Sequence, residues 1–434
     1  GRTPSDKERH LRLQSLEMLW QQEQLAHPDA TIVFSRRSNR PVPALSAVAT
    51  SSHGQGTFDS PRFAQRFWEQ RAIEAGWVSQ QSTPDRTMPF GGCTDILRWE
   101  DGTGDLADLM ALKGSEGYSS GKWRAGTSVW GRRGVLVSLM RGLPATMYLG
   151  GAFDANAAAI VPSDEHDLAS IWSYCKSGAL LEEVRKLHHG IYVPPHTFLK
   201  IPFDAAKWKS ASDLEFPGGL PTPYSESPRE WLFDGNPPSS DKSLQVALAR
   251  LVGYRWPRQT GSAFPECAAV GNDGLEKYVD TDGIVTLSPV KGEQPAAARL
   301  IALLAFSFGA EWSAAKLDTL LAQIGFGGRA LDDWLRDGFF EQHCELFLQI
   351  PFVWHIWDGR RDGFNALVNY HRLAAPNGEG RRTLEKLIYS YLGDWIDRQR
   401  ADQKAGVEGA DARLAAAEHL KVELTNILAG EPPY

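Results

Sequence analysis

The sequence lacks several features that would assign the protein to a familiar class. Its four cysteines lie far apart, at Cys93, Cys175, Cys267 and Cys344. None belongs to a CxxC pair or has a histidine at the spacing of a zinc site. No apolar run reaches the roughly 18 residues that a membrane-spanning helix needs, and the polar first residues do not form a signal peptide. We therefore expect isolated buried thiols in a reducing cytoplasm, with no metal site and no membrane contact.

The motifs of the common enzyme classes are also missing. No P-loop, HExxH or GxGxxG motif occurs. The turn at Gly150-Gly151 is the nearest candidate for a methyl-donor loop, but it lacks the second spaced glycine and a following acidic residue. Asn236-Pro237-Pro238 matches part of the loop that holds the target amine in adenine-specific DNA methyltransferases. Ser239, however, stands where an aromatic ring would stack on the flipped base. We predict no catalytic and no cofactor-binding residue in this chain.

Acidic residues are absent from one stretch, 122–141, of a chain whose formal net charge is −7. That net charge argues against a protein that coats nucleic acid by charge alone, so any such binding must be local. The stretch interleaves cations with tryptophans: Lys122, Trp123, Arg124, Trp130, Arg132, Arg133 and Arg141. Cations can contact phosphates, and indole rings can stack on bases. We expect a glycine-punctuated hairpin that contacts nucleic acid through the cations and Trp130; the alternative is a solvated cationic face.

Length and patterning predict an α+β protein of two or three domains. We expect an N-terminal helical segment at 1–40, a mixed-sheet domain at 41–235 and a mainly helical C-terminal domain at 236–434. Short apolar runs predict strands at 31–37, 77–82, 94–101, 134–140, 145–151, 157–162, 199–203, 351–359 and 363–373. Apolar spacing predicts helices at 7–26, 60–76, 163–187, 243–256, 296–308, 330–349 and within 381–429. Proline, serine and aspartate predict a linker or an extended strap at 204–242.

Several blocks occur in the order that is found in one family. A segment of the form TGDNxRFxRxFWE is matched by Gly56, Asp59, Arg62, Phe63, Phe67, Trp68 and Glu69, with Thr57-Phe58 in place of Gly-Asp. Further matching blocks are GGCTDILRWEDG (91–102), WGRRGVLVSLMR (130–141), GGAFDANAAAIVP (150–162) and FFEQHCELFLQIPFVWHIWDGRRDGFNALVNYHRL (339–373). From about residue 54 onward, the chain resembles the C-terminal portion of adenine-specific DNA methyltransferases. These include fused type II restriction–modification methylases and the large methylases of BREX and DISARM phage-defence systems.

The resemblance implies that the domain at 41–235 is a target-recognition domain and that the helical domain braces it against double-stranded DNA. Arg62 would join the cationic stretch as a DNA contact, and His371 with Arg372 would form a weaker second contact. A Rossmann-like catalytic domain, in the same or a separate chain, would bind S-adenosylmethionine, so this chain alone would be inactive. Other defence-system subunits are possible partners.

Two alternative functions stay open. A tryptophan-rich carbohydrate-active enzyme would line a sugar cleft with its indole rings and acidic side chains. A non-catalytic scaffold subunit would bind partner proteins through the helices within 381–429.

Overall fold

A computed structural model describes residues 3–13, 18, 20–22, 42–262, 264 and 267–433. The chain divides into two compact units. The first unit contains Gly1–Phe58, Gln81–Gly92 and Asp108–Thr222, and the second contains Asp59–Gln80, Cys93–Ala107 and Pro223–Tyr434. The predicted strand at 31–37 and most of the second half of the predicted helix at 7–26 lie outside the described residues.

The predicted α+β architecture is confirmed. Helices account for 47% and strands for 13% of the structure, in three small sheets followed by a helical C-terminal part. The registered strand pairs within each unit are antiparallel. A Rossmann-like core needs parallel strands joined by crossover helices. The part of the chain that the structure describes therefore contains no complete core of that kind.

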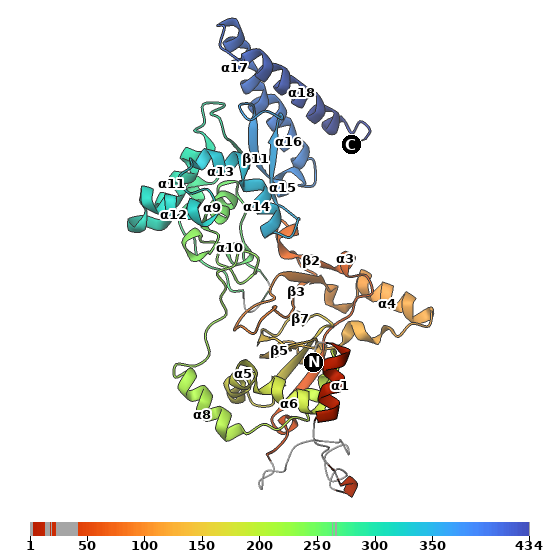
Figure 1. Ribbon diagram of the computed structural model, residues 1–434. Helices are drawn as coiled ribbons and strands as arrows, with labels where there is room; N and C mark the ends of the chain where they lie inside the picture. Colours follow the sequence, from red (N-terminus) through yellow and green to blue (C-terminus); the bar gives the residue numbers. More distant parts are fainter. Residues whose placement is uncertain are drawn as a thin grey trace. The chain divides into compact units, whose positions relative to one another are not determined.

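The first unit is built on a four-stranded sheet with the order β1-β8-β5-β6. The strands are β1 (Ala49–His53), β5 (Gly134–Ser138), β6 (Ala145–Tyr148) and β8 (Ala157–Pro162), and a two-residue strand, β7 (Ala152–Phe153), precedes β8. β5, β6 and β8 are buried at every residue. Such continuous burial is typical of strands that are covered on both faces. Helix α5 (Leu168–Lys176) supplies part of this cover, because it packs against β5, β6 and β8 (Figure 1).

The first unit also contains short helices and turns. They are α1 (Pro4–Leu13), η2 (Leu45–Ala47), most of α4 (Asp105–Ser115), η5 (Ser120–Arg124), η6 (Thr127–Val129), η7 (Glu165–Asp167), α6 (Ala179–Leu187), α7 (Pro195–Phe198) and α8 (Ala205–Glu215). The predicted helix at 163–187 is interrupted at Gly178, which takes a φ of +86° between α5 and α6.

Of two predictions between 199 and 242, one is wrong and the other holds only in part. The expected strand at 199–203 forms only an isolated bridge, in which Pro202 pairs with Ala44. The expected strap contains helix α8, because Asp204 caps that helix by accepting the Lys207 N–H at 3.0 Å. The helical part, 205–215, contains no proline or glycine, whereas residues 216–236, which hold most of the prolines of the segment, form neither helix nor strand.

In the second unit, the helix predicted at 60–76 is wrong beyond its first turn. The segment forms α3 (Ser60–Phe63), β2 (Ala64–Arg66) and η3 (Phe67–Glu69). β2 pairs antiparallel with β4 (Asp95–Arg98), and β4 also pairs with β3 (Trp77–Gln81). An ion pair between Arg66 and Asp95 joins β2 to β4. Strand pairing with a distant segment therefore overrides the helical spacing of the apolar residues.

The rest of the second unit is mainly helical. Its next elements are η4 (Glu100–Gly102), η8 (Pro237–Ser239), α9 (Ser243–Leu251), α10 (Pro257–Thr260), η9 (Leu275–Tyr278), α11 (Ala296–Phe308), η10 (Gly309–Glu311), α12 (Ala314–Gln323), α13 (Leu331–Asp337) and α14 (Phe339–Leu346). α9 is buried at every position, as a central helix must be, and α11 packs against it. The helix predicted at 296–308 is confirmed, whereas the one at 243–256 ends at Leu251 and the one at 330–349 is divided at Gly338.

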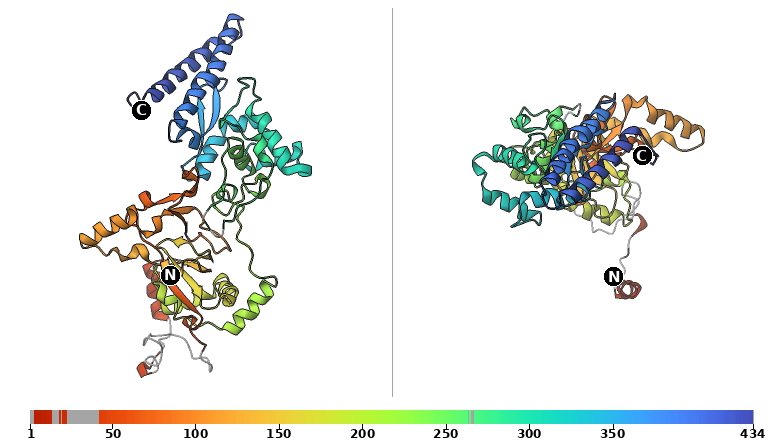
Figure 2. Two further views of the ribbon diagram at one scale, coloured as in Figure 1. Left: turned by 180° about the vertical axis from the view of Figure 1, so that it is seen from behind. Right: turned by 90° about the horizontal axis from the view of Figure 1, so that it is seen from above.

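A small sheet and a helical region complete the second unit. The sheet has the order β10-β11-β9, formed by β10 (Val353–Trp357), β11 (Asn365–Asn369) and β9 (Ile284–Thr286). Its β10–β11 pair confirms the predicted strand pair, except that the end of the second predicted strand, 370–373, is helical. The following elements are α15 (Tyr370–Leu373), α16 (Glu379–Lys386), the π-helical η11 (Leu387–Tyr391), α17 (Leu392–Lys404) and α18 (Ala410–Ala429). α17 and α18 lie side by side (Figures 1 and 2) and share a core with the sheet.

No single helix in the described part of the chain is long and apolar enough to cross a membrane. The segments Ala296–Glu311 and Ala314–Gln323 meet the length and composition criteria only as a pair, with a bend of 109° between them. A buried core helix meets the same criteria, and α11 buries Leu300, Leu303 and Leu304 in the second unit.

We predict that Asp273→Asn destabilises the second unit by about 3 kcal/mol, because it removes the partner of a buried cation. Arg250 is 1% exposed and donates to both Asp273 oxygens, at 2.7 and 2.9 Å. Burial alone would raise the pKa of Asp273, but the hydrogen bonds from Arg250 and Leu275 outweigh it and hold the pKa below its usual range. Urea unfolding at neutral pH measures the loss.

The sign of the pH dependence follows from the lowered pKa. The wild-type pair contributes its full stability above the unfolded pKa of Asp, about 3.9, and loses it as pH falls through the lower folded value. The variant should lack this decline. Asp397→Asn is the matched control, since Asp397 pairs with Arg400 on the surface with 77% of its side chain exposed. Equal losses in the two variants would contradict the prediction.

Candidate nucleic-acid interface

The cations of the 122–141 stretch are divided by β5. Arg132 and Arg133 precede this strand and Arg141 follows it; the strand spans about 16 Å at roughly 3.3 Å per residue. The part before β5 runs through the turns η5 and η6. We expected a hairpin within residues 122–141, and this prediction is wrong. The hairpin of this region is instead formed by β5 and β6. The cations belong to separate groups at the two ends of one strand.

Lys122 and Arg124 lie exposed in η5. The Lys122 carbonyl accepts a backbone N–H from the segment after β1 at 3.3 Å. The Arg124 guanidinium lies 4.5 Å from the centre of the Trp123 ring, in a cation–π contact. Gly126, at a φ of +77°, lets the chain pass Phe153, because a methyl group there would lie 2.6 Å from that ring. Packing therefore presents these two cations on a fixed turn.

The side chains just before β5 differ in exposure. Arg132 is exposed, and its Nη2 donates to the Pro162 carbonyl at the end of β8, at 2.6 Å. Arg133 and Trp130 are half-buried. The bond to Pro162 orients the Arg132 guanidinium and occupies one of its five N–H donors. Its charge pairs with no carboxylate among the described residues, so it is available to a phosphate.

Arg141 lies in a strained turn between β5 and β6. Its φ is +51°, a left-handed conformation that is unfavourable for a residue with a side chain. The surrounding backbone imposes it: the Arg141 N–H donates to the Ile191 carbonyl at 3.0 Å, and the Arg185 guanidinium donates to the Arg141 carbonyl. Arg185 also donates to the Gly190 carbonyl at 2.6 Å. The turn is therefore fixed while the exposed Arg141 side chain is not used to hold it.

A cavity of about 400 Å³ adjoins this turn within the first unit. Its lining includes two arginines, three hydroxyl side chains and one carboxylate: Arg86, Arg141, Thr83, Thr87, Ser138 and Asp85. The Thr87 Oγ1 accepts the Ala145 N–H at 3.1 Å and the Ser138 Oγ accepts the Met140 N–H at 3.2 Å, which fixes both oxygens. Neither Arg86 nor Arg141 forms an ion pair with a carboxylate in the described chain. Arginines beside hydroxyls can bind phosphate oxygens or base edges.

The second unit holds the three remaining predicted contacts. Arg62, at the end of α3, lies 3.6 Å from Asp105 and stacks over Phe63 at 4.9 Å. Its side chain is 51% exposed, so this pair is a weak surface interaction. Arg372 is half-buried in α15 and forms no ion pair with a carboxylate in the described residues.

His371 is buried, with 7% of its surface exposed. Its Nε2 donates to the Trp68 carbonyl at 3.0 Å, and its ring stacks with Tyr254. Burial lowers the pKa of His371 to about 4, so the ring is neutral above that pH. The burial of His371 therefore argues against the predicted DNA contact by this residue. Arg372, which is half-buried, can still contact a ligand.

Sequence reasoning missed Arg86 and Arg185. Arg86 lies in the segment Thr83–Thr87, where Pro84-Asp85 is a recognisable turn signal. Arg86 and Arg141 line the same cavity only because of the fold. Nothing in the sequence around either residue indicates this. Arg185 lies in the last turn of α6 and is followed by Lys186, His188 and His189, a pattern that resembles ordinary helix capping.

Comparisons with known proteins add no relative. No protein-family model matches the chain, and no curated protein matches it.

We predict that His371 lowers stability below neutral pH. The unfolded ring binds a proton near pH 6.5 and the folded ring only near pH 4. Stability is therefore fully present above pH 6.5 and declines as pH falls toward 4, by up to about 1.4 kcal/mol per pH unit from this group. Urea unfolding across that range should give a shallower slope for His371→Asn. His419→Asn, on the exposed face of α18, is the control; an unchanged slope for His371→Asn would show that the ring titrates freely.

Proposed function

We propose that this chain recognises duplex DNA through its first unit. It would act as the target-recognition part of an adenine-specific DNA methyltransferase in a phage-defence or restriction–modification system. The observation that carries the proposal is the turn between β5 and β6. There a strained backbone, fixed by Arg185, presents the exposed Arg141 beside Arg86 at a polar cavity. Strain that the surrounding structure maintains is often found at binding sites.

The chemistry of this turn suits both kinds of DNA contact. A guanidinium can donate two parallel hydrogen bonds to a phosphate or to the O6 and N7 atoms of guanine. Hydroxyl side chains such as those of Thr83 and Ser138 donate to phosphates. Lys122 and Arg132 would add contacts that position the backbone without reading sequence. The net charge of −7 means that binding depends on these local cations.

The methyl-transfer chemistry is proposed to lie in another domain or chain. Binding of S-adenosylmethionine in this enzyme class uses a Rossmann-like sheet of parallel strands. The antiparallel sheets of the described residues support a recognition role for this portion. The partners would then be double-stranded DNA, the methyltransferase catalytic domain and other subunits of the defence system.

The carbohydrate alternative has less support because several indole rings pack in the core. Trp68, Trp172, Trp231, Trp256 and Trp334 are among the largest fully buried side chains. They cannot line a sugar cleft.

The test of the proposal is the salt dependence of binding to a short DNA duplex, measured by fluorescence anisotropy between about 50 and 200 mM salt. Contact with about four phosphates gives a log–log slope near −4, at about 0.9 per contact. We expect Lys122→Gln and Arg132→Gln each to reduce the slope by about 0.9. Arg141→Gln should reduce the binding free energy by about 1–3 kcal/mol by removing the contact to one base pair of the DNA site. Selection from a random-sequence duplex library should then show a weaker base preference at that one position.

The matched control is Lys209→Gln, which removes one exposed cation that pairs with Asp213 on α8. It should leave both the slope and the sequence preference unchanged. Binding that does not respond to salt, or equal losses in the control and in the three test variants, would refute the proposal.

A further inference from the structure

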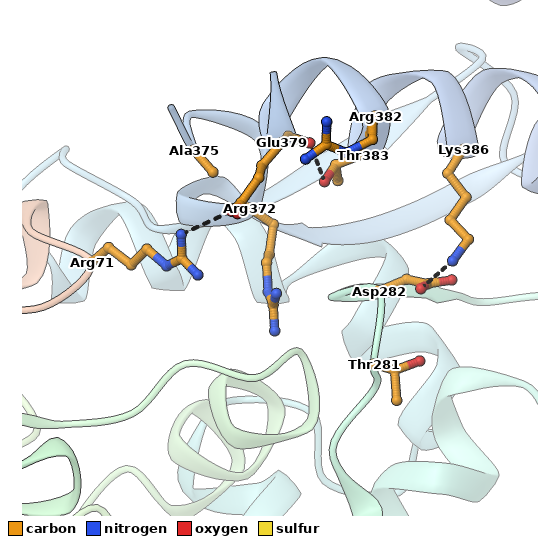
Figure 3. A pocket seen from close by; sticks show the side chains of 9 residues that line it. All are labelled: Arg71, Thr281, Asp282, Arg372, Ala375, Glu379, Arg382, Thr383 and Lys386. Atoms are coloured by element: carbon orange, nitrogen blue, oxygen red, sulfur yellow. Dashed lines mark hydrogen bonds and ion pairs between the residues drawn. The ribbon is translucent and has the colours of Figure 1, made fainter. Parts of the chain in front are cut away.

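The second unit contains a cavity of about 420 Å³ whose lining is dominated by cations. Figure 3 shows its charged side chains, which come from three separate parts of the unit. Four are cations and two are carboxylates: Arg71, Arg372, Arg382, Lys386, Asp282 and Glu379. The lining therefore carries an excess of two positive charges in a protein that is acidic overall.

Two of the cations are paired with the two carboxylates. Arg71 lies 3.1 Å from Glu379, and Lys386 contacts Asp282. The Tyr391 hydroxyl also donates to Asp282, at 2.9 Å. Burial would raise the pKa of Asp282, but the hydrogen bonds from Lys386 and Tyr391 outweigh it and hold the pKa below its usual range. Asp282 is therefore ionised at neutral pH and keeps Lys386 at the edge of the cavity.

The other two cations, Arg372 and Arg382, form no ion pair with a carboxylate in the described part of the chain. Figure 3 shows the Arg372 side chain extending between Arg71 and Asp282. Arg372 is half-buried, so its charge loses part of its hydration and is not compensated by a nearby acid. Arg382 and Lys386 lie four residues apart, on one face of α16. An anion in the cavity would supply the missing partner for both arginines.

The position of Arg372 is fixed by its neighbours. The Asn369 side chain accepts the His371 N–H at 2.9 Å and donates to the Val252 carbonyl at 3.0 Å, which anchors the start of α15. Gly283, at a φ of +71°, makes room for the Arg372 stem, because a methyl group there would lie 2.9 Å from the Arg372 Cγ. An arginine whose backbone and stem are held in advance loses less entropy when it binds an anion.

A smaller cavity of about 160 Å³ shares Arg71 and Arg372 with the first. It adds Arg255, which is exposed, and the buried ring of Tyr254 to the lining. The two cavities therefore share the same pair of arginines, and a further cation lies next to them. This arrangement suits an anion with several oxygens, or one that continues into an organic part.

We propose that the cavity lined by Arg71, Arg372, Arg382 and Lys386 binds a phosphate group. A single carboxylate would be matched by one guanidinium, whereas phosphate offers three or four oxygens and up to two charges to several donors. The phosphate can come from a small polyphosphate or from a nucleic-acid backbone, and the recognition chemistry is the same. This site is independent of the proposed DNA contact by the first unit.

The test uses isothermal titration calorimetry of the full chain with inorganic pyrophosphate, and anisotropy with a short DNA duplex. The variant is Arg372→Gln, and the matched control is Arg381→Gln, an exposed arginine of α16 that pairs with Glu385 outside the cavity. We expect binding to weaken about tenfold in Arg372→Gln, the effect of losing one charge-assisted interaction, and to be unchanged in the control. Weaker binding of pyrophosphate by Arg372→Gln would identify a small polyphosphate as the ligand. Weaker binding of the duplex alone would identify a phosphate of the nucleic-acid backbone.

Two further variants keep the result interpretable. Arg382→Gln removes the other unpaired cation from the exposed start of α16, so it tests the cavity even if Arg372→Gln perturbs folding, which circular dichroism would show. Lys209→Gln in the first unit, outside both cavities, should leave pyrophosphate binding intact. Weaker pyrophosphate binding in Arg372→Gln and Arg382→Gln supports this site whether or not Arg141→Gln alters duplex binding, so failure of the DNA proposal can be told apart from failure of this one. If neither ligand distinguishes Arg372→Gln and Arg382→Gln from Arg381→Gln, the proposal is overturned.

Discussion

Burial of β5 on both faces determines where the first unit can present charge. All five residues of Gly134–Ser138 are buried, and a guanidinium among them would lose its hydration without gaining a partner. Even the backbone is tightly packed, because a methyl group at Gly134 would lie 2.4 Å from the Ile160 carbonyl oxygen. Cations are therefore confined to the residues before and after the strand. The same burial that stabilises the sheet divides Arg132 and Arg133 from Arg141.

In the second unit, buried aromatic rings determine where a cation is presented. The neutral His371 ring bonds to the Trp68 carbonyl and stacks with Tyr254, which itself stacks on Phe352 at 3.9 Å. His343 lies in the same aromatic cluster, accepts the Val353 N–H at 3.2 Å, and has its pKa lowered to about 3 by burial. These rings are structural, and they fix α15. The cation that follows, Arg372, is thereby directed toward the cavity.

The two candidate sites share one physical arrangement. In each, groups other than the ligand fix the backbone or the stem of an arginine, and its guanidinium is left without a carboxylate partner in the described chain. Arg141 is fixed by backbone hydrogen bonds and Arg372 by packing against Gly283. Exposed pairs such as Arg62 with Asp105 differ, because both charges already have a partner and contribute little. The two sites are distinguished from the rest of the surface by arginines that have no carboxylate partner in the described chain. The number of cations in a stretch of sequence matters less.

The sequence by itself determined the α+β class, the helix at 296–308 and the strand pair at 351–373, because apolar spacing and continuous apolar runs are local properties. It also located the acid-free stretch at 122–141 that contains Arg132 and Arg141. Only the tertiary structure decided that residues 64–66 form a strand, that His371 is buried, and that Arg71, Asp282 and Arg372 line one cavity. Those outcomes depend on which distant segments pack together, and the free energy of that packing leaves no periodic pattern in the chain.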